Sequence, residues 1–148
     1  GNVVEADIRA RSASQLPFGK VELVTSRAPW LGEPLPAAAI LWVTALTASA
    51  LPERNPYPRL YEALGGLLDA ICHAPSARGW APALLSYEAL LLRDLGYGGL
   101  KPEPGDLPAT LDGLRKIAPA LERYLLADRR GDAMAARGRL IERLARIA

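Results

Sequence analysis

Side chains that commonly act in catalysis are scarce in this chain of 148 residues, which has one cysteine and one histidine. A single cysteine, Cys72, excludes an internal disulfide and a structural zinc site built from several cysteines, and it is typical of a reducing compartment. His73 follows it directly, but neighbours in a helix point about 100° apart, so the two cannot readily act as base and nucleophile. No glycine-rich loop lies between a strand and a helix to cradle phosphate. The sequence predicts a protein that is not an enzyme and uses no cofactor or metal.

The chain has almost no excess of one charge sign, because 18 Lys and Arg nearly balance 16 Asp and Glu and leave a net charge of +2. This is well short of the excess that indicates nucleic-acid binding. The distribution is uneven, however, and from residue 115 onward nine basic side chains stand against four acidic ones. An anion-binding face is therefore expected near the C-terminus.

Charged residues are absent from one segment, residues 34–52. Its helical part is shorter than the roughly 20 apolar residues that a bilayer requires, it contains Thr44, Thr47 and Ser49, and no basic cluster flanks it. We therefore expect the buried central helix of a bundle and no membrane contact.

Alternation of apolar and charged residues over 4–11, repeated over 20–24, predicts two half-buried antiparallel strands. Two strands alone are marginal in water, so the ribbon either lies against the helices or belongs to a larger sheet. Helices are predicted over residues 35–50, 58–74, 82–95, 108–127 and 132–147, and Pro36, Pro58, Pro82 and Pro108 fall in or near their first turns. Pro119 should kink or divide the fourth helix. The predicted fold is mainly α, a helical bundle after a short antiparallel β segment.

One acidic residue, Glu88, lies inside a leucine-rich helix. We expect it on an exposed edge, as ordinary decoration of a helix surface. The alternative is that Glu88 is buried and holds a basic side chain such as Arg59, because a buried carboxylate needs a partner.

The last predicted helix is the strongest binding candidate. Arg139, Arg143 and Arg146 share one face beside an apolar stripe, and with Arg129 and Arg130 they could grip a phosphate backbone. No aromatic residue interleaves with them, so contacts to the backbone are favoured over base stacking. A merely solvated face is the alternative.

Two motifs resemble the RecO family of bacterial recombination mediators. Residues 51–64, LPERNPYPRLYEAL, resemble the family's LPEREPHPxLYxxL segment, and residues 87–97, YEALLLRDLGY, are similar to its (W/F)ELxLLxELG(F/Y) signature. Gly1-Asn2 resembles the PGN step before the last strands of the family's OB barrel. The resemblance implies that residues 1–28 are the end of an OB-like barrel and residues 29–148 the α-helical domain.

The chain departs from the family in two places. The first half of the barrel is absent, which leads us to expect that the sequence is incomplete at its start. A four-cysteine zinc module follows the Gly-Tyr of many members, but here residues 98–100 run almost directly into Lys101 and the next helix.

The function implied by the resemblance is non-catalytic. Such a protein acts in the cytoplasm at the nucleoid, binds single- and double-stranded DNA, anneals strands, engages RecR and helps RecA to load onto DNA coated by single-strand-binding protein. The DNA-binding residues would be Arg9, Arg11 and Lys20 in the barrel, supported by Arg139, Arg143 and Arg146.

The family's helical domain also binds the acidic, aromatic tail of the single-strand-binding protein. A basic residue beside an apolar groove, such as Arg59 near Tyr61 or Arg93, has suitable chemistry. The alternative function is a helical protein-interaction module without DNA binding.

Overall fold

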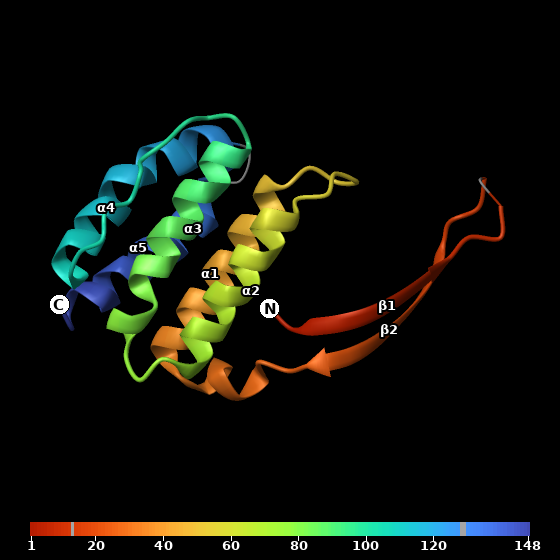
Figure 1. Ribbon diagram of the computed structural model, residues 1–148, viewed down its shortest axis with the longest axis horizontal. Coiled ribbons are helices and arrows are strands. Elements are labelled where there is room, and N and C mark those ends of the chain that lie inside the picture. The colour runs from red at the N-terminus through yellow and green to blue at the C-terminus, as the bar shows by residue number, and fades with distance from the viewer. Residues whose placement is uncertain (13, 128–129) are drawn as a thin grey trace.

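The structure, a computed structural model, describes residues 1–12, 14–127 and 130–148, leaving out the side chains of residues 130–132. In chain order its elements are β1 (Val3–Arg9), β2 (Phe18–Thr25), the 3₁₀ turn η1 (Ala28–Gly32), α1 (Pro34–Ala50), α2 (Pro58–His73), the 3₁₀ turn η2 (Ala77–Gly79), α3 (Ala81–Asp94), α4 (Leu107–Ala120), the π-helical turn η3 (Leu121–Leu125) and α5 (Arg130–Ala145). This confirms a mainly α fold that follows a short antiparallel β segment. Figure 1 shows the β1–β2 hairpin extending away from the bundled helices.

The helices begin where the prolines predicted. Each of α1 to α4 has a proline at its first or second residue, where the missing N–H costs no helical hydrogen bond. The carboxylate of Asp106 caps α4 by accepting from the Ala109 amide at 2.9 Å. Gly96 ends α3 with a φ of 86°, a conformation that glycine adopts without strain.

Pro119 lies one residue before the end of α4, where the helix changes type. Regular α-helix continues to Ala120, and the chain then widens into the π turn, in which the Leu126 amide donates to the Leu121 carbonyl at 3.1 Å. Proline lacks the N–H that would close the preceding helical turn, and its ring crowds that turn. The expected kink or division therefore coincides with a change from α-helical to π-helical hydrogen bonding directly after α4.

The core lies between α1 and its neighbours, because α1 contacts α2, α5 and η1 while α3 contacts α2 and α4. Trp42, Val43 and Leu46 of α1 are buried, which confirms a central helix, although Leu41 on its outer side is 62% exposed. Gly113 lets α4 approach α3, since a Cβ there would collide with Leu85. Within the described residues, none of the helices has both the length and the hydropathy needed to cross a bilayer.

Glu88 is buried, so the expectation of an exposed edge was wrong. Its Oε2 atom lies 2.6 Å from Nη2 of Arg137 on α5, and its Oε1 atom accepts from Nε of Arg137 at 3.0 Å and from the Trp42 indole at 2.8 Å. Arg137 also donates to the carbonyl of Leu114 on α4 at 2.7 Å. The alternative was right in kind, but the partner is Arg137 and not Arg59. This network joins α1, α3, α4 and α5.

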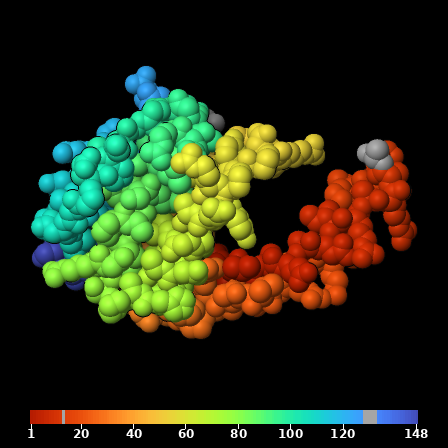
Figure 2. Space-filling model, in the orientation of Figure 1, coloured from red at the N-terminus to blue at the C-terminus, as the bar shows by residue number. Residues whose placement is uncertain are grey.

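The hairpin is exposed on both faces, so the prediction of half-buried strands was wrong within this structure. Its register pairs Val4 with Leu23 and Ala6 with Val21 on an apolar face, and these four residues are all exposed. In Figure 2 the hairpin forms an arm beside the helical body, and the arm's base alone meets that body. The alternation of residues gives two chemically different faces, but no described element covers the apolar one.

Candidate functional site

A groove between α1 and α5 brings together two of the predicted arginines. Arg139 and Arg143 border a hollow of about 330 Å³ whose other walls are apolar or backbone, formed by Pro34, Ala37, Ala38, Leu41 and Ala136. Nη1 of Arg143 donates to the carbonyl of Pro34 at 2.7 Å, which fixes this guanidinium at the end of the groove. The arrangement places a cation beside an apolar floor. We call this hollow the α1/α5 groove.

The other residues of the predicted C-terminal binding helix differ in exposure. Arg146 is exposed beyond the end of α5, while Leu140 and Leu144 of the predicted apolar stripe are fully buried. Arg129 and the side chain of Arg130 lie outside the described residues. Arg139 and Arg143 therefore lie on the exposed side of α5 and the two leucines on its buried side, as the sequence predicted, whereas Arg137 is buried in the core.

Two of the predicted hairpin cations pair with acids of the hairpin itself. Arg9 pairs with Asp7 at 2.7 Å, and Lys20 pairs with Glu22 at 2.5 Å, with all four side chains more than half exposed. Arg9 and Arg11 lie together at the hairpin's outer end, where they line a shallow hollow with Gln15, Leu16 and Phe18. The strand register places Glu5 opposite Glu22 on the face that bears Arg9 and Lys20, which weakens that face as an anion site.

The three predicted partner-binding residues do not form one site. Arg59 is 3.6 Å from Asp94 of α3, whereas Tyr61, 74% exposed, lines a hollow with the N-terminal residues. Arg93 is exposed on α3. Residues two apart on a helix face different ways, so Arg59 and Tyr61 cannot share a groove.

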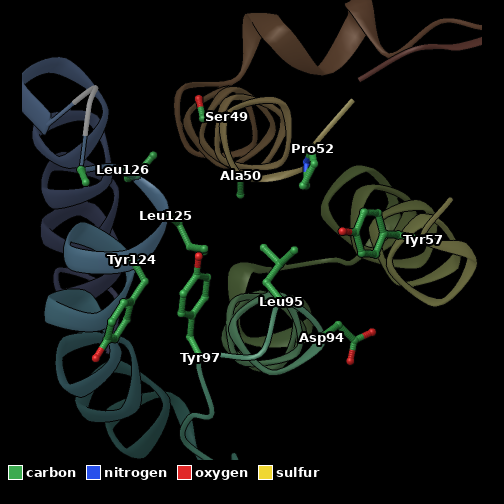
Figure 3. Close-up of a pocket in the computed structure, with 11 residues that line it drawn as sticks. Ser49, Ala50, Pro52, Tyr57, Asp94, Leu95, Tyr97, Tyr124, Leu125 and Leu126 are labelled. Atoms are coloured by element: carbon green, nitrogen blue, oxygen red, sulfur yellow. The ribbon is translucent and has the colours of Figure 1, made fainter. Parts of the chain in front are cut away.

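The two family-like motifs converge on a second hollow of about 570 Å³ (Figure 3). The first motif contributes Pro52 and Tyr57, and the second contributes Asp94, Leu95 and Tyr97. Its remaining walls come from the end of α1 and from η3, with Tyr124, Leu125 and Leu126. We call it the tyrosine cleft.

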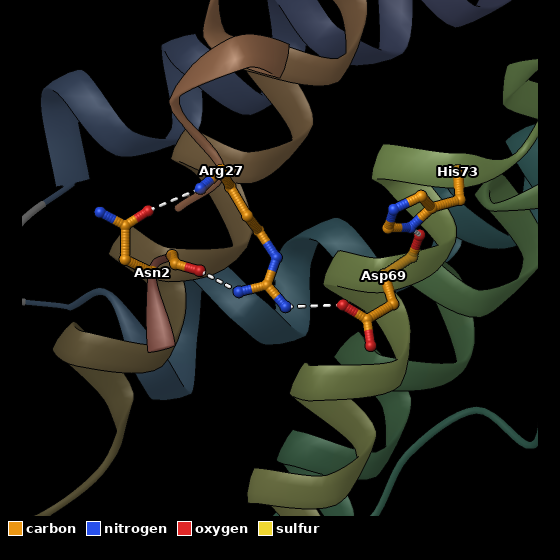
Figure 4. Close-up of polar contacts among 5 residues, drawn as sticks. Asn2, Arg27, Asp69 and His73 are labelled. Atoms are coloured by element: carbon orange, nitrogen blue, oxygen red, sulfur yellow. Dashed lines mark hydrogen bonds and ion pairs between the residues drawn. The ribbon is translucent and has the colours of Figure 1, made fainter. Parts of the chain in front are cut away.

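A buried arginine that the sequence analysis did not single out joins the hairpin to the helices. Arg27 is 5% exposed, and its guanidinium donates to the carbonyl of Gly1 and, at 2.7 Å, to the carboxylate of Asp69 on α2 (Figure 4). Its backbone amide donates to the Asn2 side chain at 2.9 Å. Arg27 lies two residues after the end of β2, and no local pattern marks it. It fixes the base of the hairpin against α2.

Cys72 and His73 lie at the end of α2 in separate environments. Burial raises the pKa of the Cys72 thiol above its ordinary value, and the nearby Arg27 lowers it in part. The Nδ1 atom of His73 lies 2.8 Å from the carbonyl of Asp69, and its ring meets Trp30 edge-on. In the described part of the chain, no three His, Cys, Asp or Glu side chains gather closely enough to hold a metal ion.

Comparison with known proteins agrees with these motifs. Residues 34–98 match the family model Recombination protein O C terminal. The chain is 37% identical over 132 residues to the DNA repair protein RecO of Paracoccus denitrificans, which covers 89% of this chain and 53% of that protein. It is 39% identical over 101 residues to the DNA repair protein RecO of Gluconacetobacter diazotrophicus, covering 66% of this chain and 40% of that protein. No solved structure matches the chain.

A β-hairpin attached to a helical bundle, with hollows bordered by arginine and tyrosine side chains, defines the class as a mainly helical domain with an N-terminal hairpin. Through its helical part the chain is similar to proteins of the RecO family. It spans about half the length of the first of these relatives and less of the second.

Proposed function

We propose that this chain is a non-catalytic accessory factor of DNA repair that binds DNA and partner proteins in the cytoplasm, at the nucleoid. The observation that carries the proposal is the α1/α5 groove, which holds Arg139 and Arg143 in a chain related to proteins named for DNA repair. Its roles would be those that the RecO resemblance implies, namely annealing of strands, engagement of RecR, and loading of RecA onto DNA coated by single-strand-binding protein.

The proposed DNA contacts are electrostatic. Arg139, Arg143 and Arg146 would neutralise phosphates and release counterions, which makes binding fall with added salt. Arg9, Arg11 and Lys20 would add contacts from residues 1–28, proposed as strands of an OB-type barrel beside the helical domain of residues 29–148. The exposed apolar face of the hairpin supports this, because such a face suits packing inside a larger sheet.

The α1/α5 groove also suits the acidic, aromatic tail of the single-strand-binding protein. Guanidinium groups form strong charge-assisted hydrogen bonds to carboxylates, and the apolar floor beside Leu41 offers a place for an aromatic ring. In this proposal the groove replaces Arg59, Tyr61 and Arg93 as the tail-binding site. DNA and the tail would then compete for Arg139 and Arg143.

A second candidate is a protein-interaction module without DNA binding. It is favoured by the cations that already have partners within the chain, since Arg9 and Lys20 pair with acids and Arg143 donates to a backbone carbonyl. An apolar groove would hold its partner in high salt, whereas phosphate contacts would not.

Fluorescence anisotropy of a labelled single-stranded oligonucleotide, at low and at physiological salt, tests the proposal. The parent chain is compared with an Arg139/Arg143/Arg146→Ala variant and with an Arg9/Arg11/Lys20→Ala variant of matched charge. Salt-sensitive binding that the first variant weakens supports DNA handling by α5. Absence of binding even at low salt, with a labelled acidic peptide ending in phenylalanine still bound, favours the interaction module.

A further inference from the structure

The tyrosine cleft lies apart from the α1/α5 groove and serves none of the contacts proposed above. We propose that it docks a cationic side chain, an arginine or a lysine, from a basic segment of a partner protein. Three properties of the cleft carry this proposal: the helix ends around it, its aromatic walls and one carboxylate. Each is independent of the DNA and tail contacts of α5.

Helix ends give the cleft a negative potential. Ser49 and Ala50 end α1, Leu95 follows α3, and Leu126 follows η3, so three C-termini meet at its walls. The last carbonyl groups of a helix lack helical partners and carry partial negative charge, which attracts cations. The N-terminus of α2 opposes this effect, and Pro58 reduces that opposition by one N–H group.

Aromatic rings add a surface that attracts cations. Tyr97 and Tyr124 stack with ring centres 4.8 Å apart and planes 12° from parallel, and both remain accessible, at 47% and 40%. In Figure 3 the hydroxyl of Tyr57 is turned toward the cleft from the opposite wall. The chain itself pairs one of these rings with a cation, since Arg123, which does not line the cleft, lies 5.3 Å from the centre of the Tyr124 ring. Ring faces of this kind bind guanidinium and ammonium groups.

The carboxylate of Asp94 gives the tyrosine cleft a formal negative charge. Its side chain is 16% exposed, and its partner Arg59 lies 3.6 Å away with 70% exposure, a longer separation than a hydrogen-bonded ion pair has. The carboxylate can therefore accept a second, closer cation. An acidic peptide would meet this carboxylate and three negative helix ends, so a basic segment is the occupant that the charges favour.

The test uses the 148-residue chain with ¹³C-labelled tyrosine rings, which gives five signals that NMR can follow separately. The probe is a short peptide whose only charged group is one central arginine, and its control carries citrulline, the neutral isostere of arginine. We expect the arginine peptide to shift the signals of Tyr57, Tyr97 and Tyr124 saturably. Tyr61 and Tyr87 lie outside the cleft and should not move.

Charge dependence decides the proposal. The citrulline peptide and an Asp94→Asn variant should each weaken binding about three- to fivefold, the usual size of an exposed cation–aromatic and carboxylate contribution. The matched control is Asp112→Asn, which neutralises an exposed carboxylate on α4 and should change nothing. Equal affinity for the two peptides on the unaltered chain, or no saturable shift of the cleft tyrosines, overturns the proposal. The outcome is independent of DNA binding by α5.

Discussion

Removal of the buried carboxylate of Glu88 should destabilise the helical bundle severely. Glu88→Ala leaves the guanidinium of Arg137, 4% exposed, without its counterion and the indole N–H of Trp42 without an acceptor. Breaking a buried ion pair from one side costs about 3–5 kcal/mol, and an unsatisfied buried donor adds about 1–3 kcal/mol. Domains of this size have a total stability of about 5–15 kcal/mol, so the variant should be close to unfolding.

Urea unfolding followed by circular dichroism measures this effect. Glu88→Gln should be milder, because its amide oxygen can still accept from Trp42. The double variant Glu88→Met/Arg137→Met removes both charges. Its loss of unfolding free energy should be smaller than the sum of the losses of the single variants Glu88→Met and Arg137→Met. The exposed pair Arg115–Asp112 provides the control, and Arg115→Ala should cost under about 1 kcal/mol. Strict additivity in the double variant would refute the argument that an unpaired buried charge causes the loss.

Three further predictions concern other buried side chains. Arg27→Ala should destabilise the chain by about 2 kcal/mol and speed amide exchange at the hairpin base, whereas Arg9→Ala, at an exposed position, should do neither. Tyr87→Phe removes a 2.7 Å hydrogen bond to Thr47 and should cost about 1 kcal/mol near neutral pH. Burial raises the pKa of Tyr87 above its ordinary 10.0, so the tyrosine ionises first in the unfolded state. As the pH rises from 10.0 toward the raised value, the parent chain should therefore lose more stability than the Tyr87→Phe variant. A constant difference in stability between the two would contradict this. Burial also raises the pKa of Cys72, so iodoacetamide should modify the native thiol far more slowly than the thiol in urea, and equal rates would refute its protection.

The helices could be predicted well because their signals are local. Prolines in first turns and leucine stripes placed the starts of α2 to α4 within one residue, and the alternation at residues 4–11 marked β1. Burial could not be judged in the same way. Glu88 becomes a core residue only because Arg137, 49 residues further on, reaches it through the bundle.

The sites show the same limit. Arg139 and Arg143 were predicted from helical spacing, but the apolar wall that makes a groove beside them belongs to α1, about 100 residues earlier in the chain. Arg59 and Tyr61 looked like one site because they are near in sequence, yet they face different neighbours. The tyrosine cleft depends on three helix ends that meet only after folding.

The dependence of single-stranded DNA affinity on salt tests the central claim most directly. Each phosphate neutralised on a single strand contributes about 0.7 to the slope of log affinity against log salt concentration. If Arg139, Arg143 and Arg146 each contact a phosphate, their replacement by alanine should reduce the magnitude of that slope by about 2. An unchanged slope, with intact binding of the acidic peptide, would contradict DNA handling by α5 and favour a purely protein-binding groove.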